Sequence, residues 1–272
     1  MKSLTNKQPL PQEHFYKICV VGGGMTGAIM ALLLKKSKLF NTNDIAWIMP
    51  NIKIPNDLRT TFYNEESIEL LSKLNIWRDL KKSDYTNVKK IQVFGKKNTT
   101  PLIWNNSNKE QNFGAVVKNK VMLDSIFSKL DDIKKFENFV TNTTCDNFER
   151  TLYFNDKHYI KTNLVLCADG KNSQLRKLLL IKTILKKTGH IAISGFLEQS
   201  KDHKLTATQA FTELGPIGLL PFENKNKINF VLSVEETKYK NILSKNNPEQ
   251  YICEKLENFF SNLNLKFKPI KK

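Results

Sequence analysis

Three glycines that follow a short strand-like run constrain the fold of this chain more than any other feature. Residues 17–21 (Lys-Ile-Cys-Val-Val) have strand character, and residues 28–34 form an apolar, helix-favouring run. Between them, Gly22, Gly24 and Gly27 have the G-x-G-x-x-G spacing. With a strand before it and a helix after it, this spacing predicts the first βαβ turn of a dinucleotide-binding fold.

Each glycine has its own predicted task. Gly22 permits the tight turn out of the strand, Gly24 lets the backbone approach a pyrophosphate, and Gly27 lets the helix pack closely on the sheet. The amides at the helix N-terminus, at the positive end of its dipole, would face the phosphates. The candidate cofactor-binding residues of the turn are therefore Gly22, Gly23, Gly24, Met25, Thr26 and Gly27.

The next strand lacks the acidic residue that usually binds a ribose. Residues 44–49 are predicted as the second parallel strand, because a short apolar run ends there at Pro50. The dinucleotide pattern places an acid at the end of this strand, but Met49 stands there and Asp44 lies at the opposite end. Ribose binding is therefore left to Asn51 or to backbone groups.

A second apolar run, residues 164–168, ends in Asp169-Gly170. Such a run is typical of a central parallel strand that is buried on both faces. Cys19 and Cys167 would then be small buried hydrophobes. Asp169 would lie at the carboxyl end of its strand, where ligands bind in open α/β sheets. The alternative is an ordinary turn, since Asp-Gly is a common turn pair.

The pattern changes after residue 87 to short strand-like runs, which indicates a second domain. The predicted fold class is α/β. It combines a Rossmann-like dinucleotide-binding domain with a parallel sheet, over residues 15–87 and 151–185, and a β-rich α+β domain, over residues 88–150 and 186–272. In the second domain, residues 214–222 contain two glycines and two prolines. We expect an irregular path there, as a turn or as the wall of a ligand cavity.

The composition indicates the cellular compartment of the protein and the class of protein to which it belongs. The chain has 272 residues, of which 40% are hydrophobic, so it can bury a core. The polar N-terminus has no apolar signal-peptide region, and the run at residues 28–34 is far too short to span a bilayer. The four cysteines form no C-x-x-C pair, which favours a reducing compartment. We therefore expect a cytoplasmic protein.

The formal net charge of +17 raises the alternative of nucleic-acid binding. Only four of the 43 basic residues are arginine, and the lysines are spread along the whole chain. This pattern favours a solvated basic surface, weakly attracted to the anionic inner face of a membrane, over a nucleic-acid site.

Four motifs in order resemble the flavin-dependent aromatic hydroxylases of ubiquinone biosynthesis, within the para-hydroxybenzoate-hydroxylase-like superfamily. The first is the glycine turn. The second is Asp57-x-Arg59, ahead of a helix that ends in Leu-Asn-Ile-Trp at residues 74–77. The third is Ala-Asp-Gly-x-x-Ser-x-x-Arg at residues 168–176, and the fourth is Phe-x-x-x-Gly-Pro-Ile-x-Leu-Leu-Pro at residues 211–221.

The resemblance implies an FAD-binding domain and a substrate domain. The glycines would hold the FAD diphosphate, Arg59 would lie near the cofactor, and Asp169 and Gly170 would contact it. The activity implied is hydroxylation of a polyprenylated phenol through a flavin C4a-hydroperoxide, with NAD(P)H or an electron-transfer protein as reductant. The resemblance implies no catalytic triad, metal or covalent nucleophile. It also implies a place in a ubiquinone-biosynthesis complex.

One further motif of the family is missing. Family members carry a Gly-Asp-Ala-x-His type FAD segment near the C-terminus, and nothing in residues 235–272 resembles it. This departure raises an alternative function, a truncated or degenerate flavoprotein that acts as a non-catalytic accessory subunit. An NAD-dependent dehydrogenase is a further alternative, although no histidine of the chain lies within the four motifs.

Overall fold

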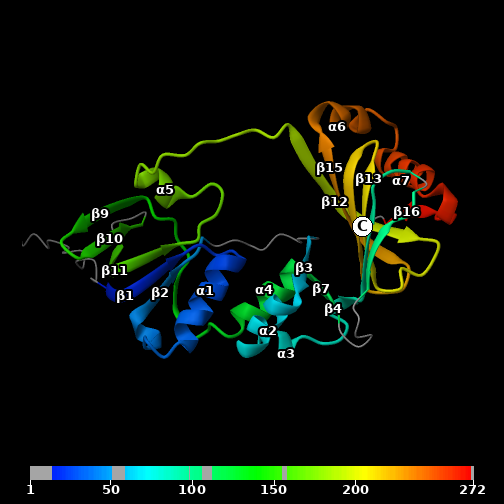
Figure 1. Ribbon diagram of the computed structural model, residues 1–272. Helices are drawn as coiled ribbons and strands as arrows, with labels where there is room; N and C mark the ends of the chain where they lie inside the picture. Colours follow the sequence, from blue (N-terminus) through cyan, green and yellow to red (C-terminus); the bar gives the residue numbers. More distant parts are fainter. Residues whose placement is uncertain (1–13, 51–58, 98, 106–111, 155–157, 271–272) are drawn as a thin grey trace, which may run out of the picture. The chain divides into compact units, whose positions relative to one another are not determined.

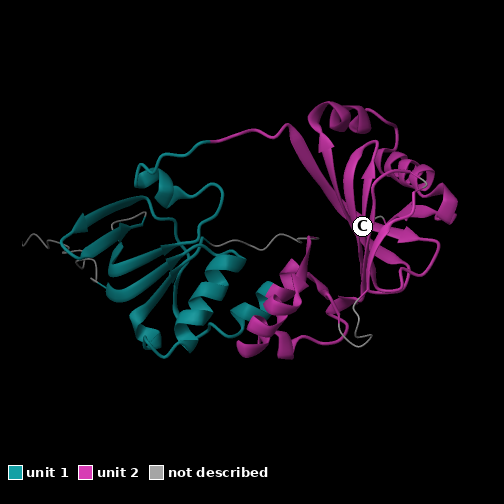
Figure 2. Cartoon of the chain, viewed as in Figure 1, with its two compact units in different colours: residues 1–55, 123–184 teal, residues 56–122, 185–272 magenta. Residues whose placement is uncertain are grey.

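The computed structural model describes residues 14–50, 59–97, 99–105, 112–154 and 158–270. The chain forms two compact units (Figure 2), one of residues 1–55 and 123–184 and the other of residues 56–122 and 185–272. These boundaries differ from the expected ones. Residues 56–87 were expected in the first domain and residues 123–150 in the second, but each set lies in the other unit.

The boundaries differ because strand pairing over long sequence distances decides them. Residues 134–136 form a strand beside residues 46–48 in the first unit. Residues 60–64 form a strand that pairs with residues 114–118 in the second unit. Neither pairing is visible in local periodicity, which reports only that a segment is a strand.

The first unit contains a six-stranded sheet in the order β8-β2-β1-β11-β10-β9 (Figure 1). The strands β8, β2, β1 and β11 run parallel to one another, and β10 and β9 complete the sheet as antiparallel strands. Their bounds are β1 (His14–Val21), β2 (Ile45–Ile48), β8 (Lys134–Phe136), β9 (Asn142–Asp146), β10 (Glu149–Tyr153) and β11 (Tyr159–Cys167). The helical elements are α1 (Met25–Lys36), η1 (Thr42–Asp44), α5 (Gln174–Leu178) and α4 (Asn119–Phe127), which crosses the unit boundary.

The predicted β-α-β unit is present. The helix α1 connects β1 to the parallel strand β2 and packs on both. It buries its small residues Ala28 and Ala31 together with Leu32. Trp47 of β2 is fully buried and meets the ring of Phe127 edge-on, at a centroid distance of 5.1 Å.

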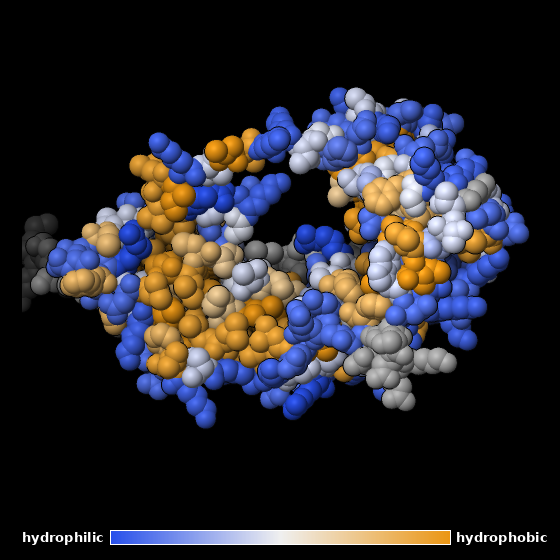
Figure 3. All heavy atoms as spheres, viewed as in Figure 1, coloured by the Kyte–Doolittle hydropathy of each residue, from blue (hydrophilic) through white to orange (hydrophobic). Residues whose placement is uncertain are grey.

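The expectation that residues 164–168 are buried on both faces was wrong. The strand β11 does run parallel to β1, but its other neighbour is the antiparallel strand β10. Leu164 is 51% exposed and Cys167 is exposed. The reason is the placement of the helices, because α1 packs on β1 and β2 and no described helix packs on β11 to a similar extent. Hydrophobic side chains accordingly reach the surface of this unit (Figure 3).

The second unit contains a seven-stranded sheet in the order β16-β12-β15-β14-β13-β5-β6 and a three-stranded sheet in the order β3-β7-β4. The strands of the large sheet are β5 (Lys90–Phe94), β6 (Leu102–Asn105), β12 (His190–Gln199), β13 (Thr206–Thr212), β14 (Gly215–Pro221), β15 (Lys227–Glu235) and β16 (Phe267–Pro269). Those of the small sheet are β3 (Thr60–Asn64), β4 (Tyr85–Val88) and β7 (Gly114–Lys118). The helical elements are α2 (Glu65–Lys73), α3 (Ile76–Asp79), α6 (Glu236–Leu243), α7 (Pro248–Phe259) and η3 (Ser261–Leu263).

Residues 236–269 complete this second unit. The aromatic side chains of Phe259, Phe260 and Phe267 join the core that the large sheet forms with Phe94. The strand β16 pairs with β12 at one end of the large sheet. The segment in which the family's last FAD motif was sought therefore contributes to the core of the second unit.

The irregular path expected for residues 214–222 was also wrong. Seven of these residues form the regular strand β14, which pairs with β13 and β15. The prolines are tolerated because they stand near the two ends of the strand, at Pro216 and Pro221. Gly215 has a φ of 138° and lies against the carbonyl of Ser233, where a side chain would not fit.

None of the helices in the described part of the chain is long and apolar enough to cross a membrane.

Candidate dinucleotide-binding site

Gly22 stands at a crowded junction of three strands. Its φ is 131°, and a side chain there would collide with the backbone of Ala168 and Asp169. Its amide donates to the carbonyl of Ile48 at 2.8 Å, and its carbonyl accepts from the indole of Trp47 at 2.9 Å. The turn out of β1 is therefore held by the ends of β2 and β11.

The other two glycines differ in the space around them. A side chain at Gly27 would collide with the carbonyl of Gly22, so the first turn of α1 packs directly on the strand exit. Gly24 is exposed, and a side chain there would meet no atom within 4 Å. The turn thus has a closed side that sets its shape and an open side that leaves room beside Gly24.

The open side leads to the N-terminus of α1. The first bond within the helix runs from the amide of Ala28 to the carbonyl of Gly24, which has no side chain to cap the helix. The preceding amides, those of Met25, Thr26 and Gly27, have no partner within the helix by its geometry. No acidic residue lies in the first turn. This end of a 12-residue helix therefore presents donors and a positive dipole to an anion.

The structure brings the Asp169-Gly170 pair to the same place. The amide of Ala168 donates to the carbonyl of Val21 at 2.7 Å, so the end of β11 lies against the start of the glycine turn. Gly170 is exposed, with a φ of 78°. Asp169 is half-buried, and one of its carboxylate oxygens accepts from the amide of Leu175 at 3.1 Å.

The pair therefore also fits the ordinary-turn interpretation. The carboxylate of Asp169 binds the first turn of α5, and the hydroxyl of Ser173 caps the same helix by accepting from the amide of Arg176 at 3.0 Å. The guanidinium of Arg176 donates to the carbonyl of Lys171 at 2.6 Å. These bonds hold the loop after β11 in one shape, which keeps Gly170 at the open surface.

At the ribose position, the structure confirms that the end of β2 carries no acid. The amide of Met49 donates to the carbonyl of Phe136 at 2.9 Å, which places Met49 directly after β2. Asp44 lies at the other end of the strand, where it pairs with Lys17 at 3.0 Å. The hydrogen bond from Lys17 holds the pKa of Asp44 below its usual value. Asn51 lies outside the described residues.

One predicted residue, Arg59, is not part of the first unit. Arg59 lies in the second unit, just before β3, and its carbonyl accepts from the amide of Asn119 at 3.0 Å. Asp57 falls outside the described residues. A role for Arg59 at the cofactor therefore stays a prediction.

Two thiols of the first unit, those of Cys19 and Cys167, have raised pKa values. Burial raises the pKa of Cys19 far above its usual value, and the packing around the more exposed Cys167, together with the neighbouring Asp169 carboxylate, raises the pKa of that thiol. Both thiols are therefore protonated at neutral pH and poor nucleophiles. The described geometry of the glycine turn offers backbone donors to an anion.

Several known proteins resemble this chain in sequence or in fold. No protein-family model matches the chain. The chain is 25% identical to a ubiquinone biosynthesis monooxygenase COQ6 of Caenorhabditis elegans over 232 residues, which cover 78% of this chain and 51% of that protein. The corresponding proteins of Dictyostelium discoideum and Drosophila melanogaster are 24% and 25% identical and cover 82% and 80% of this chain. All three are named as mitochondrial. The resemblance predicted from the sequence is confirmed.

The chain spans about half the length of these curated relatives, from 49% to 53%. Solved structures confirm the fold. A probable FAD-dependent monooxygenase, PqsL of Pseudomonas aeruginosa, has a TM-score of 0.76 at 13% identity, over 94% of this chain and 73% of that one. A salicylate hydroxylase in complex with substrate has a TM-score of 0.67 at 14% identity, over 94% of this chain and 68% of that one. The fold is that of the FAD-dependent monooxygenases.

The glycine turn fits the diphosphate of FAD. The N-terminus of α1 offers several amides, and the space beside Gly24 admits a phosphate close to the backbone. Trp47 and Ile48 were missed as site residues in the sequence, because their role depends on hydrogen bonds to Gly22 across the sheet. The available signal was the position of an indole donor at the end of the second strand.

Proposed function

We propose that this chain is an FAD-dependent aromatic monooxygenase that hydroxylates a polyprenylated phenol in ubiquinone biosynthesis. The observation that carries the proposal is the glycine turn, locked by Trp47 and Ala168, which opens onto an uncapped helix N-terminus beside Asp169-Gly170. Similarity to three ubiquinone-biosynthesis monooxygenases along about four fifths of the chain supports the choice of substrate class.

In this proposal the first unit is the FAD-binding domain and the second is the substrate domain. The amides of Gly23 to Gly27 bind the diphosphate, and Gly170 with Asp169 contacts the cofactor. Arg59 of the second unit contributes to cofactor binding. FAD, when bound, supplies the activation of oxygen and the transfer of one oxygen atom to an electron-rich ring. NAD(P)H or an electron-transfer protein is the reductant.

The proposed partners of the chain follow from its assignment as a monooxygenase of ubiquinone biosynthesis. The substrate class and the relatives support a place in a ubiquinone-biosynthesis complex. A net charge of +17 supports peripheral contact with an anionic membrane, which would bring the protein to a prenylated substrate. The same charge is spread along the chain and does not by itself favour nucleic acid.

FAD binding to a Gly24→Ala variant tests the cofactor assignment. The added methyl group meets no protein atom, so the fold is retained, but it occupies the space in which the diphosphate approaches. We expect the wild-type chain to bind FAD and the variant to bind it at least about tenfold more weakly, a loss of ~1.4 kcal/mol, in a fluorescence titration.

Gly95→Ala is the matched control. Gly95 is also exposed, and a methyl group there would likewise meet no atom within 4 Å, but this residue lies in the turn between β5 and β6 of the second unit. We expect this variant to bind FAD like the wild type. Colourless wild-type protein that takes up no added FAD, or equal affinities for all three chains, would contradict the cofactor assignment.

A second candidate function is a non-catalytic flavoprotein that serves as an accessory subunit. It is favoured by one observation, that residues 236–269, where the family's Gly-Asp-Ala-x-His segment was sought, pack into the core of the second unit instead. A hydroxylase assay with FAD, a chemical reductant of the flavin and a prenylated phenol separates the two candidates. Turnover eliminates the accessory role, whereas FAD binding without turnover eliminates the monooxygenase role for this chain.

A further inference from the structure

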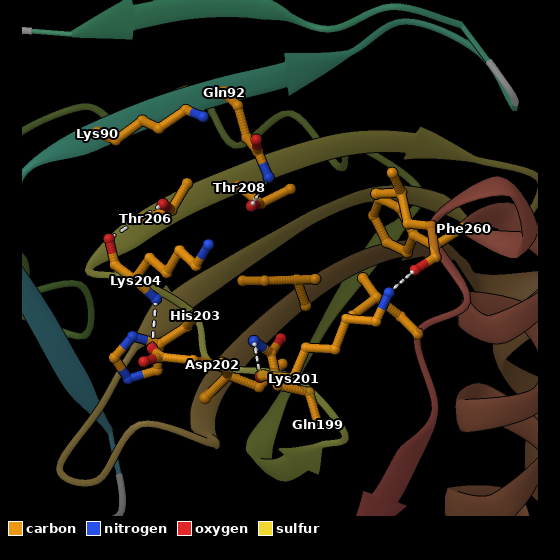
Figure 4. A pocket seen from close by; sticks show the side chains of 14 residues that line it. Lys90, Gln92, Gln199, Lys201, Asp202, His203, Lys204, Thr206, Thr208 and Phe260 are labelled. Carbon is orange, nitrogen blue, oxygen red and sulfur yellow. Dashed lines mark hydrogen bonds between the residues drawn. The ribbon is translucent and has the colours of Figure 1, made fainter.

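The large sheet of the second unit carries a pocket that the proposed function does not use (Figure 4). Its volume is about 370 Å³, within the range of pockets that hold small ligands. All of its lining residues belong to this one unit. They are Lys90, Gln92, Gln199, Lys201, Asp202, His203, Lys204, Thr206, Thr208, Leu219, Ile228, Phe260, Leu263 and Leu265.

The pairing of β5, β13 and β14 fixes the positions of the polar side chains in the pocket floor. Gln92 of β5, Thr208 of β13 and Leu219 of β14 are direct partners in neighbouring strands. Lys90 and Thr206 are partners two residues earlier in β5 and β13, and they therefore lie on the same face of the sheet. The side-chain amide of Gln92 donates to the hydroxyl of Thr208 at 2.8 Å, and this bond orients both side chains. These residues therefore line one face of the sheet at fixed positions.

The rest of the floor is apolar. Leu219, Ile228 and Phe260 are all less than 5% exposed and belong to the core of the unit. Leu263 and Leu265 pack against the same core and also line the pocket. A ligand in this pocket would therefore meet amide and hydroxyl groups on one part of its surface and aliphatic and aromatic groups on another.

The rim is cationic. Lys90 lies on one side of the pocket, and Lys201 and Lys204 lie on the opposite side (Figure 4). The amino group of Lys201 donates to the carbonyl of Leu263 at 2.6 Å. Neither Lys90 nor Lys204 has a carboxylate partner within the part of the chain that the structure describes. Asp202 lies nearby, but its carboxylate accepts from the backbone amide of Lys204 at 2.7 Å.

The loop that carries Lys204 is held in an unusual conformation. Lys204 and Leu205 have φ values of 47° and 54°, which side-chain-bearing residues seldom adopt. His203, 8% exposed, stabilises them, because its Nδ1 accepts from the amide of Leu205 at 3.1 Å. Its Nε2 donates to the carbonyl of Asn224 at 2.9 Å. Strained backbone of this kind gathers at ligand-binding loops, and here it fixes the base of the Lys204 side chain.

We propose that this pocket binds an amphipathic carboxylate, with the carboxylate between Lys90 and Lys204 and its aliphatic part against Leu263 and Leu265. Two ammonium groups without carboxylate partners attract an anionic head. The half-buried side chains of Leu263 and Leu265 leave apolar surface for a ligand to cover, which favours a hydrocarbon body over a small hydrated anion. The pocket lies within the second unit, and the inference does not depend on FAD.

Calorimetric titration of the whole chain with sodium octanoate tests the proposal. Acetate, which lacks the hydrocarbon body, and 1-octanol, which lacks the charge, are the matched ligands. We expect octanoate to bind at least tenfold more tightly than either. Equal affinity for octanoate and acetate, or for octanoate and 1-octanol, would overturn the assignment of an amphipathic anion, as would no measurable octanoate binding.

A double variant locates the binding to this pocket. In Lys90→Gln/Lys204→Gln we expect octanoate affinity to fall at least tenfold while FAD affinity is unchanged. The matched control is Lys82→Gln/Lys240→Gln, which removes the same charge from two exposed lysines of this unit that do not line the pocket. An equal loss in both double variants would show a non-specific charge effect and would contradict the site. Failure of FAD binding in the wild type would bear only on the proposed function.

Discussion

Gly22 combines two constraints that act on a single residue. Its φ of 131° is unfavourable for any side chain, and the neighbouring backbone of Ala168 and Asp169 leaves no room for one. Gly24, two residues later, has an ordinary φ of −80° and open space around it. The same residue type therefore serves the structure at one position and ligand access at the other.

The effect of Gly22→Ala on stability tests this distinction. Backbone strain at such a position costs about 1–3 kcal/mol, and the collision with Ala168 adds to it. We expect the free energy of unfolding to fall by at least about 2 kcal/mol in urea denaturation. Gly24→Ala, the matched control, should change it by less than about 0.5 kcal/mol. Equal losses in the two variants would refute the assignment of separate roles.

His203 is a second residue whose environment has a measurable consequence. Burial lowers its pKa below the ordinary value of 6.5. Its Nδ1 accepts from the amide of Leu205, so the protonated ring, a donor at both nitrogens, would lose this bond. The folded protein therefore holds His203 neutral under conditions in which the unfolded chain protonates it.

The sign of the pH dependence follows from this difference. As the pH falls through about 6.5, the unfolded chain binds a proton at this histidine before the folded protein does, so stability falls until the lower folded pKa is passed. We expect the wild type to lose more free energy of unfolding between pH 7.5 and 5.5 than His203→Gln, as measured by urea denaturation. Parallel pH profiles for the two proteins would contradict this.

At the scale of helices and strands, features that depend on a few neighbouring residues were predicted better than features that depend on pairing between distant strands. The glycine spacing identified β1, the turn and α1, because the chemistry of that segment is contained within a dozen residues. The apolar run at residues 164–168 predicted a strand and its parallel direction, which the structure confirms. Its burial was predicted wrongly, because burial depends on where helices pack. The bonds of Trp47 and Ile48 to Gly22 and the unit boundaries depend on pairing between distant strands.

Two leucines in neighbouring strands test the unequal burial of this sheet. Leu164 of β11 is 51% exposed, whereas Leu152 of β10 is fully buried. We expect Leu152→Ala to cost about 2–5 kcal/mol of unfolding free energy, as is usual for core leucines. Leu164→Ala should cost less than about 1 kcal/mol. Similar losses in the two variants, measured by urea denaturation, would show that the exposed half of β11 is covered in solution.

At the scale of the whole molecule, each of the two units has a main hydrophobic core among its described residues. One core contains Cys19, Val21 and Ile48 of the first unit, and the other contains Phe94 and Phe260 of the second. The clusters share no residue. A cofactor bound by the glycine turn would therefore stabilise the first core directly. Since ligand binding to the native state adds to its stability by mass action, the effect should be largest in the unit that supplies most of the cofactor contacts.

The tryptophans allow this to be measured unit by unit. Trp47 lies in the first unit, and Trp77, which packs on Tyr85 at a centroid distance of 5.2 Å, lies in the second. In protein labelled with 5-fluorotryptophan, ¹⁹F NMR follows the loss of each native signal with urea. FAD at 100 times its Kd adds about 2.7 kcal/mol to the state that binds it. We expect FAD to move the Trp47 midpoint to higher urea by more than it moves the Trp77 midpoint, whereas an equal shift of both signals would mean that the two units unfold as one.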